Sequence, residues 1–213
     1  MRARLADVAR AARRLGVLGG SFDPPHAGHL HAAQAAREAF ALDHVVLVPA
    51  ALPPHKPGRA LAGAEDRLAL LELLRGERAW LSVSGLELER AGPSYTIDTV
   101  RALARETDAE LFLIIGSDNL PGLPGWREAE ELLARAQPIV IQRAGEAPAL
   151  GDAARRLSPA AAERLRAGLC AVAPVEASSS ELRRRLALGQ DPGPALPRAL
   201  REYIERTGIY GAA

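Results

Sequence analysis

The fold is decided by the stretch Gly-Gly-Ser-Phe-Asp-Pro-Pro-His-Ala-Gly-His at residues 19–29, which directly follows the apolar run Leu15–Leu18. A buried strand that ends in two glycines brings bare backbone close to a ligand. A helix that begins near His26 directs its free N–H groups and the positive end of its dipole at the same point. Since His26 and His29 are three residues apart, they share a face of the first helical turn and can both donate to phosphate oxygens. The stretch therefore predicts a phosphate site at the end of a buried strand.

Apolar runs of strand length alternate with helical periodicity along the whole chain. We expect strands at Leu15–Leu18, His44–Val48, Trp80–Leu86, Glu110–Ile115, Ile139–Ile141 and Leu169–Val172. We expect helices at Leu30–Ala41, Glu65–Arg75, Thr96–Glu106, Trp126–Ala134, Ala153–Ala167, Ser180–Leu188 and Pro197–Thr207. This alternation predicts a Rossmann-like, doubly wound parallel sheet of five to six strands with helices on both faces. Ligands bind such sheets at the carboxyl ends of the strands.

Length and composition indicate a cytoplasmic enzyme with one main domain. The chain has 213 residues, of which 48% are hydrophobic, and its net charge of +1 gives no general attraction to nucleic acid or membranes. Its single cysteine excludes a disulfide framework, and it shows no signal peptide or membrane-spanning run. We expect residues 15–213 to form the domain and residues 1–14 to be an N-terminal extension of unknown role, with Leu5, Val8 and Ala12 as one apolar stripe. The sequence leaves the oligomeric state open, a homo-oligomer included.

The only lysine among the 27 basic residues is Lys56, in the segment Leu-Pro-Pro-His-Lys-Pro at residues 52–57. Where arginine is used everywhere else, a retained lysine suggests a place that needs a compact ammonium rather than a guanidinium fork. A phosphate contact is the candidate role. The alternative is an ordinary surface lysine in a proline-rich loop.

A second motif is Pro-Ser-Tyr-Thr-Ile-Asp-Thr at residues 93–99. Ser94 or Thr96 is placed to cap the helix that follows, and capping alone would account for the hydroxyl groups.

A third motif, Ile-Gly-Ser-Asp-Asn-Leu at residues 115–120, ends a strand with side chains that can accept hydrogen bonds from ribose hydroxyls. Trp126 follows in a Pro-Gly loop. Its flat indole face can stack on a ligand ring, or it can fix the loop to the core.

A fourth motif is Ala-Ser-Ser-Ser-Glu-Leu-Arg at residues 177–183. Hydroxyls at a helix N-terminus with Arg183 one turn later make a second anion site, suited to the β- and γ-phosphates of ATP. The alternative is a plain helix cap followed by a solvated charge run.

Together the four motifs and the Leu-Pro-Pro-His-Lys segment resemble those of bacterial nicotinate-nucleotide adenylyltransferases, members of the nucleotidylyltransferase superfamily. The resemblance runs in family order from about Leu15 to the closing Gly-Ile-Tyr at residues 208–210. Ala177 stands where the family usually has Ile, Ser180 where it has Thr, and Arg127 where relatives often have an aromatic residue. The resemblance implies that ATP and nicotinate mononucleotide react to deamido-NAD and pyrophosphate in NAD biosynthesis.

The resemblance also implies residue roles. ATP contacts are expected from Gly19, Gly20, Ser21, Phe22, His26, His29, Gly116, Asp118, Ser178, Ser179, Ser180 and Arg183. Contacts to nicotinate mononucleotide are expected from Lys56, Tyr95, Thr96, Trp126, which would stack on the pyridine ring, and Arg127 through its backbone N–H.

The chemistry implied here requires no general base. The attacking group is the 5′-phosphate of the mononucleotide, which is largely dianionic at neutral pH because its second pKa is about 6. The reaction needs in-line alignment and neutralisation of charge, for which we assign His26, His29, Lys56 and Arg183, with Mg²⁺ on the phosphates. The sequence shows no His, Cys and carboxylate cluster that would hold a metal ion tightly on the protein.

Two alternatives stay open. A sister adenylyltransferase would act on nicotinamide mononucleotide or phosphopantetheine, although residues 93–99 and Trp126 speak against phosphopantetheine, which offers no ring to stack. A nucleotide-binding module without catalysis would keep the Gly-rich loop while losing the histidines or Arg183, and all of these are present.

Overall fold

The structure, a computed structural model, describes residues 5–54, 61–143, 150–173, 175 and 177–211. Within these residues six parallel strands form one sheet in the order β3-β2-β1-β4-β5-β6. The strands are β1 (Arg14–Gly20), β2 (His44–Pro49), β3 (Leu81–Val83), β4 (Glu110–Gly116), β5 (Gln137–Arg143) and β6 (Leu169–Val172). The strand order reverses between β1 and β4, which is the doubly wound arrangement, so the expected Rossmann-like parallel sheet is confirmed.

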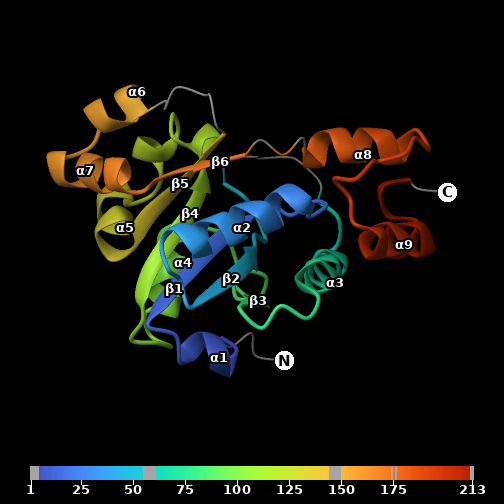
Figure 1. Cartoon of the computed structure of the whole chain (residues 1–213), viewed down its shortest axis with the longest axis horizontal. Coiled ribbons are helices and arrows are strands. Elements are labelled where there is room, and N and C mark those ends of the chain that lie inside the picture. The colour runs from blue at the N-terminus through green and yellow to red at the C-terminus, as the bar shows by residue number, and fades with distance from the viewer. Residues whose placement is uncertain (1–4, 55–60, 144–149, 174, 176, 212–213) are drawn as a thin grey trace.

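Helices cover both faces of the sheet (Figure 1). They are α1 (Asp7–Arg10), α2 (Ala27–Ala39), α3 (Ala64–Arg75), α4 (Thr96–Leu103), α5 (Ala129–Arg135), α6 (Leu150–Arg155), α7 (Pro159–Ala167), α8 (Ser179–Ala187) and α9 (Arg198–Thr207), with short 3-10 turns η1 (Ser117–Asn119), η2 (Leu123–Gly125) and η3 (Ile209–Gly211). In one apolar cluster the helices α4, α5, α6 and α7 pack against one face of the sheet, and in a second cluster α2 and α3 pack against the other face. No helix in the described part of the chain has the length and apolar character needed to cross a membrane.

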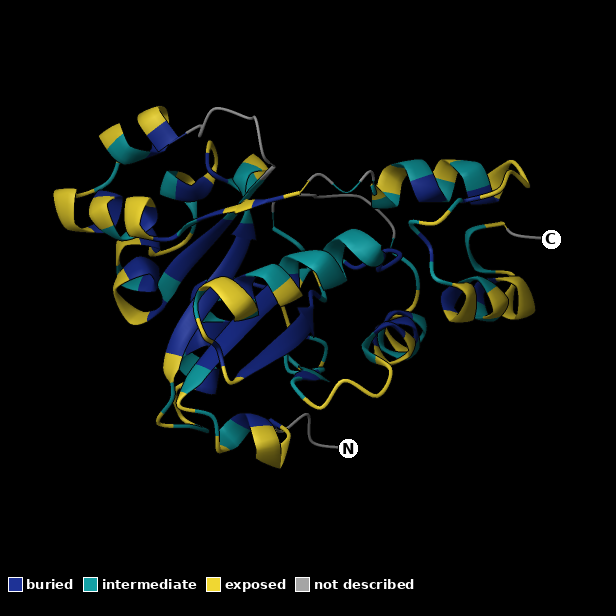
Figure 2. Cartoon of the chain, viewed as in Figure 1, coloured by how far each residue is buried: buried dark blue, intermediate teal, exposed yellow. Residues whose placement is uncertain are grey.

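Burial on both faces explains why the strands read as continuous apolar runs. Every residue of β2 is buried, and the central strands are dark in Figure 2. A third apolar cluster lies beside the sheet and joins α3 to α8 and α9 through Leu70, Leu186 and Leu200. This cluster places the C-terminal helices next to the loop that follows β1.

Several helix boundaries differ from expectation, and two of them have a local cause in the structure. The α2 helix spans Ala27–Ala39 rather than Leu30–Ala41, and α4 ends at Leu103 rather than at Glu106. The helix expected from Trp126 begins at Ala129, because Glu128 adopts a left-handed conformation with φ of 51°. The single helix expected over 153–167 is divided into α6 and α7, because Ser158 caps α7 through a 3.2 Å hydrogen bond from Ala161 N–H and Pro159 occupies its first position.

The N-terminal residues also depart from expectation. Val8 is 62% exposed, whereas Leu5 and Ala9 are buried, so the apolar stripe expected from Leu5, Val8 and Ala12 is wrong. The backbone N–H of Leu5 donates to Glu106 Oε2 at 3.0 Å. The described part of the segment before β1 therefore packs on the same core as the strands and α4.

Candidate active site

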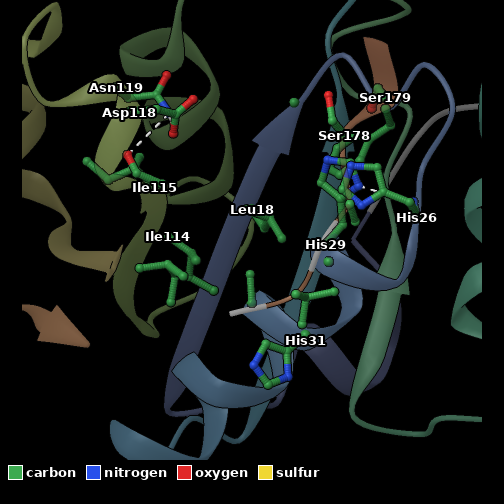
Figure 3. A pocket seen from close by; sticks show the side chains of 18 of the residues that line it. Leu18, His26, His29, His31, Ile114, Ile115, Asp118, Asn119, Ser178 and Ser179 are labelled. Atoms are coloured by element: carbon green, nitrogen blue, oxygen red, sulfur yellow. Dashed lines mark hydrogen bonds between the residues drawn. The ribbon is translucent and has the colours of Figure 1, made fainter. Parts of the chain in front are cut away.

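A cavity of about 820 Å³ opens at the carboxyl edge of the sheet, between the ends of β1 and β4. It lies where the strand order reverses, the position at which doubly wound sheets bind ligands. Of the residues expected to contact ATP, those lining it are Gly19, Gly20, Ser21, Phe22, His26, His29, Gly116, Asp118, Ser178, Ser179 and Ser180. Figure 3 shows His26 and His29 beside Ser178 and Ser179 on one side, with Asp118 and Asn119 across from them.

The two histidines form a stacked pair at the start of α2. Their ring centroids lie 3.8 Å apart at an interplanar angle of 29°. The backbone N–H of His26 donates to Nδ1 of His29 at 3.1 Å, so Nε2 of a neutral His29 carries the proton and can donate to a ligand. Burial lowers the pKa of His26 to about 4, so at pH 7 its ring is neutral and donates a single N–H.

Two helix N-termini meet at this side of the cavity, those of α2 and α8. The hydroxyl of Ser179 donates to the backbone oxygen of Pro24 at 2.9 Å, which ties α8 to the Gly-rich loop. A Cβ at Gly28 would lie 3.0 Å from Nδ1 of His26 and 3.2 Å from Cβ of Ala177, so this close approach favours glycine. The positive ends of both helix dipoles therefore favour an anion at the same place.

Asp118 lies at the opposite side, in the turn after β4. Asn119 Nδ2 donates to Oδ1 of Asp118 at 3.1 Å and to the backbone oxygen of Gly116 at 3.3 Å. A Cβ at position 116 would clash with Oδ1 of Asp118, so a larger residue there would displace this carboxylate. The arrangement holds a carboxylate where it can accept hydrogen bonds from sugar hydroxyls.

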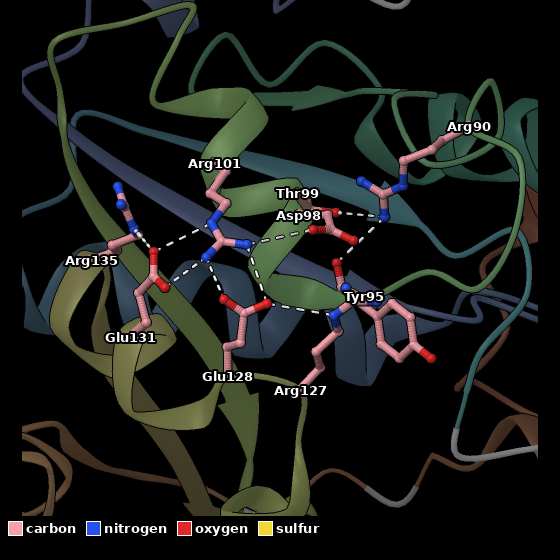
Figure 4. Close-up of polar contacts among 9 residues, drawn as sticks. All are labelled: Arg90, Tyr95, Asp98, Thr99, Arg101, Arg127, Glu128, Glu131 and Arg135. Carbon is pink, nitrogen blue, oxygen red and sulfur yellow. Dashed lines mark hydrogen bonds and ion pairs between the residues drawn. The ribbon is translucent and has the colours of Figure 1, made fainter.

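The described residues expected to bind the acceptor form a separate group outside the lining of this cavity, namely Tyr95, Thr96, Trp126 and Arg127. Arg127 and Tyr95 lie beside each other in Figure 4, and the guanidinium of Arg127 is 4.7 Å from the ring centroid of Tyr95. Tyr95 and Trp126 are half-buried and pack against the core, and Thr96 begins α4. Lys56 lies outside the described residues.

An ion-pair network connects the start of α4, which carries Tyr95 and Thr96, to the segment before α5, which carries Trp126 and Arg127. Arg101 of α4 donates to Glu131 Oε2 at 2.6 Å and also pairs with Glu128 just before α5 (Figure 4). Because α4 begins at Thr96 and α5 follows Arg127 closely, this network holds the two segments side by side.

The motif at residues 93–99 is further tied to the end of β2. Ser94 does not cap α4, whose N-cap residue is Tyr95 without a side-chain bond, so the expected capping by Ser94 or Thr96 is wrong. Instead, Ser94 Oγ accepts from the N–H of Ala51 at 2.9 Å, and Thr99 Oγ1 donates to the buried Glu87 at 2.5 Å. Burial raises the pKa of Glu87 above its ordinary value.

Several cavity residues were not expected from the sequence. They include His31, Val172 and Ala173. His31 could have been found from its helical spacing, because it is three residues after Gly28 on the face of α2 that meets the cavity. Val172 and Ala173 end a strand without any polar residue that would signal a ligand.

The fold and the cavity define the class of this protein, a doubly wound α/β protein whose cavity lies at the end of its first strand, where such folds bind nucleotides. The family model described as cytidylyltransferase-like matches residues 17–185.

Curated relatives and solved structures narrow the class. The chain is 41% identical over 210 residues to a probable nicotinate-nucleotide adenylyltransferase of Halorhodospira halophila, covering 93% of this chain and 96% of the relative. It is 40% identical over 200 residues to one of Roseiflexus sp., covering 92% and 97%. The structure of Plasmodium falciparum nicotinic acid mononucleotide adenylyltransferase complexed with NaAD superposes with a TM-score of 0.71 at 16% identity, covering 94% and 98% of the two chains. The chain belongs to the nicotinate-nucleotide adenylyltransferase family.

Proposed function

We propose that this chain transfers AMP from ATP to nicotinate mononucleotide and releases deamido-NAD and pyrophosphate, a step of NAD biosynthesis. The observation that carries the proposal is the stacked pair of His26 and His29 at the N-terminus of α2, inside a cavity that faces Asp118. The names of the relatives support the choice of acceptor.

In this reaction an oxygen of the acceptor 5′-phosphate attacks the α-phosphorus of ATP. One P–O bond forms, the bond from the α-phosphorus to the bridging oxygen breaks, and pyrophosphate leaves with that electron pair. The attacking phosphate is already largely dianionic at pH 7, because its second pKa is about 6, so no side chain needs to remove a proton. The protein contributes alignment and stabilisation of the charge that develops.

The side chains at the anion end of the cavity suit that task. The Nε2–H of His29 and the ring N–H of His26 donate to the α-phosphate, and Arg183 places positive charge near the β- and γ-phosphates. The role expected of Lys56, which lies outside the described residues, stays a prediction. Because His26 is neutral at pH 7, it acts here as a hydrogen-bond donor rather than as a full charge.

Asp118 would hold the ribose, and the group formed by Tyr95, Thr96, Trp126 and Arg127 would hold nicotinate mononucleotide. The indole of Trp126 offers a face for the pyridine ring, and the hydroxyl of Thr96 and the backbone N–H of Arg127 offer donors to its carboxylate.

Mg²⁺ enters as part of the substrate MgATP. In the described part of the chain, no three His, Cys, Asp or Glu side chains are grouped so that they could hold a metal ion. Mg²⁺ commonly keeps several waters and binds through substrate phosphates, where it neutralises charge. Activity measured against free Mg²⁺ at fixed ATP should follow the concentration of the MgATP complex, and activity that persists in excess EDTA would contradict this role.

A pyrophosphate-release assay with each acceptor in turn tests the proposed function. Each buried donor that faces the NH₂ of an amide costs about 1–3 kcal/mol, and the Thr96 hydroxyl and the Arg127 N–H are two such donors. We therefore expect nicotinate mononucleotide to exceed nicotinamide mononucleotide by at least about tenfold in kcat/KM. Equal use of both would refute the acid preference, and turnover of phosphopantetheine alone would assign the sister activity. Nucleotide binding without pyrophosphate release would indicate a non-catalytic module. A cytoplasmic location and a homo-oligomer also stay predictions.

A further inference from the structure

A buried carboxylate, Asp23, lies within the stretch at residues 19–29, lines the cavity and contacts several distant segments. Asp23 is 1% exposed. Its Oδ1 accepts from the hydroxyl of Tyr210 at 2.8 Å and from the backbone N–H of Ala62 at 3.1 Å. The guanidinium of Arg183 lies 3.7 Å from Oδ2. One side chain thus connects the phosphate loop to the segment before α3, to α8 and to the C-terminal turn η3.

Arg67 supplies a buried positive charge to the same cluster. It is 3% exposed and donates to the backbone oxygens of Ser21 at 2.9 Å and Ala50 at 2.7 Å. Burial lowers the pKa of Arg67, and the neighbouring Asp23 carboxylate opposes that shift. Because a buried carboxylate is stable only beside a cation or several donors, Arg67 and the two donors on Oδ1 together accommodate the charge of Asp23.

Arg183 links this buried cluster to the cavity. Its Nη1 donates to the backbone oxygen of Asp23, and its Nη2 donates to Ser180 Oγ at 3.0 Å. Ser180 lines the cavity. The orientation of the guanidinium therefore depends on where Asp23 lies.

Tyr210 is held in place as a donor. It is half-buried, packs against the cluster of α8 and α9, and adopts a left-handed φ of 65°, which is uncommon for a bulky residue. Burial and the adjacent Asp23 carboxylate raise the pKa of Tyr210 above its ordinary value. The hydroxyl therefore remains protonated and donates to Asp23 at any pH at which the enzyme works.

We propose that Tyr210 is a positioning residue of the ATP site, because its hydroxyl holds Asp23 so that Arg183 is directed at the β- and γ-phosphates. Without that hydroxyl, buried Asp23 loses a donor and draws the guanidinium from 3.7 Å into a closer ion pair, away from the phosphates. The inference rests on the proposed function for the identity of the nucleotide.

The test compares Tyr210→Phe with Tyr203→Phe. The control removes a tyrosine–aspartate hydrogen bond of 2.9 Å between α9 and Asp66 of α3. Calorimetry measures the Kd of ATP and of AMP, which lacks the β- and γ-phosphates. For Tyr210→Phe we expect the Kd of ATP to rise about tenfold, the scale of a lost charge-assisted hydrogen bond, and the Kd of AMP to change less than about twofold. Tyr203→Phe should change neither.

A double variant and a melting curve keep the test decisive. In an Arg183→Gln background, Tyr210→Phe should have no additional effect on the ratio of the ATP and AMP Kd values. The inference would be overturned by equal weakening of ATP and AMP binding, by the same loss of ATP binding in Tyr203→Phe, or by an additive loss in the double variant. Each of these outcomes indicates a general loosening of the folded structure. Thermal unfolding shows whether each variant is folded. A wild type that does not bind ATP would contradict the proposed function. If the wild type is active and Tyr210→Phe binds ATP with the wild-type Kd, only this inference is contradicted.

Discussion

Replacing His26 by Gln should remove part of the pH dependence of stability. His26 is 8% exposed, and burial lowers its pKa from 6.5 to about 4 in the folded chain. Below pH 6.5 the unfolded chain therefore binds a proton that the folded chain does not, so stability is present above pH 6.5 and is lost as the pH falls toward 4. The difference between 6.5 and about 4 is roughly 2.5 units, and at about 1.4 kcal/mol per unit it corresponds to about 3 kcal/mol.

Urea unfolding followed by circular dichroism at pH 7, 6, 5 and 4.5 measures this loss. Paired carboxylates such as Glu131 and Glu181 also lose their ion pairs in acid, but they are present in both proteins and cancel in the difference. We expect the free energy of unfolding of wild type minus that of His26→Gln to fall by about 2 kcal/mol between pH 7 and pH 4.5. A difference that does not vary with pH would refute the burial of a neutral imidazole at the start of α2.

Three further predictions concern activity. His29→Ala should lower kcat by on the order of 10²-fold, the cost of losing one preorganised donor to the transition state, with less effect on ATP binding; near-normal turnover in a steady-state assay would contradict the site. The Lys56→Arg variant should have clearly reduced activity although the charge is kept, because a planar guanidinium cannot replace a compact ammonium. Wild-type kinetics would indicate that Lys56 is an ordinary surface lysine. Thr99→Val should raise the KM of the acceptor more than that of ATP, because Glu87 loses a donor within the acceptor motif, while Thr99→Ser should retain wild-type values; equal effects of the two variants would show that the hydroxyl does not matter.

The positions of the strands could be predicted because each strand is a run of apolar residues followed by a turn, whereas their order in the sheet comes from the structure. The runs around Val17, Val46 and Leu113 are buried on both faces, so their sequences carry no polar alternation that would confuse them with helices. The strand expected over 80–86 was overextended, since pairing with β2 ends at Val83 and the backbone N–H of Ser84 donates to Leu47. Edge strands are short for reasons of pairing that a single sequence does not encode.

The residues around the cavity were predictable where a motif is local. His26 and His29 are three residues apart, so helical spacing alone places them together. The contact between Asp23 and Tyr210 joins residues 187 apart in sequence, and nothing near either residue signals the other. Ser94 was misread because its hydroxyl bonds across to Ala51 on another loop rather than to its own helix. Local patterns thus predict local geometry, whereas polar contacts between distant loops depend on the fold as a whole.

The reversal of strand order between β1 and β4 has an evolutionary consequence. The described residues that would choose the acceptor lie after β3 and β4, outside the sheet, while the strands that support them are buried. Loops tolerate substitution and insertion far better than a packed sheet does. A lineage with this scaffold can therefore change its acceptor through a few loop mutations and keep its ATP chemistry, so new specificity arises without a new fold.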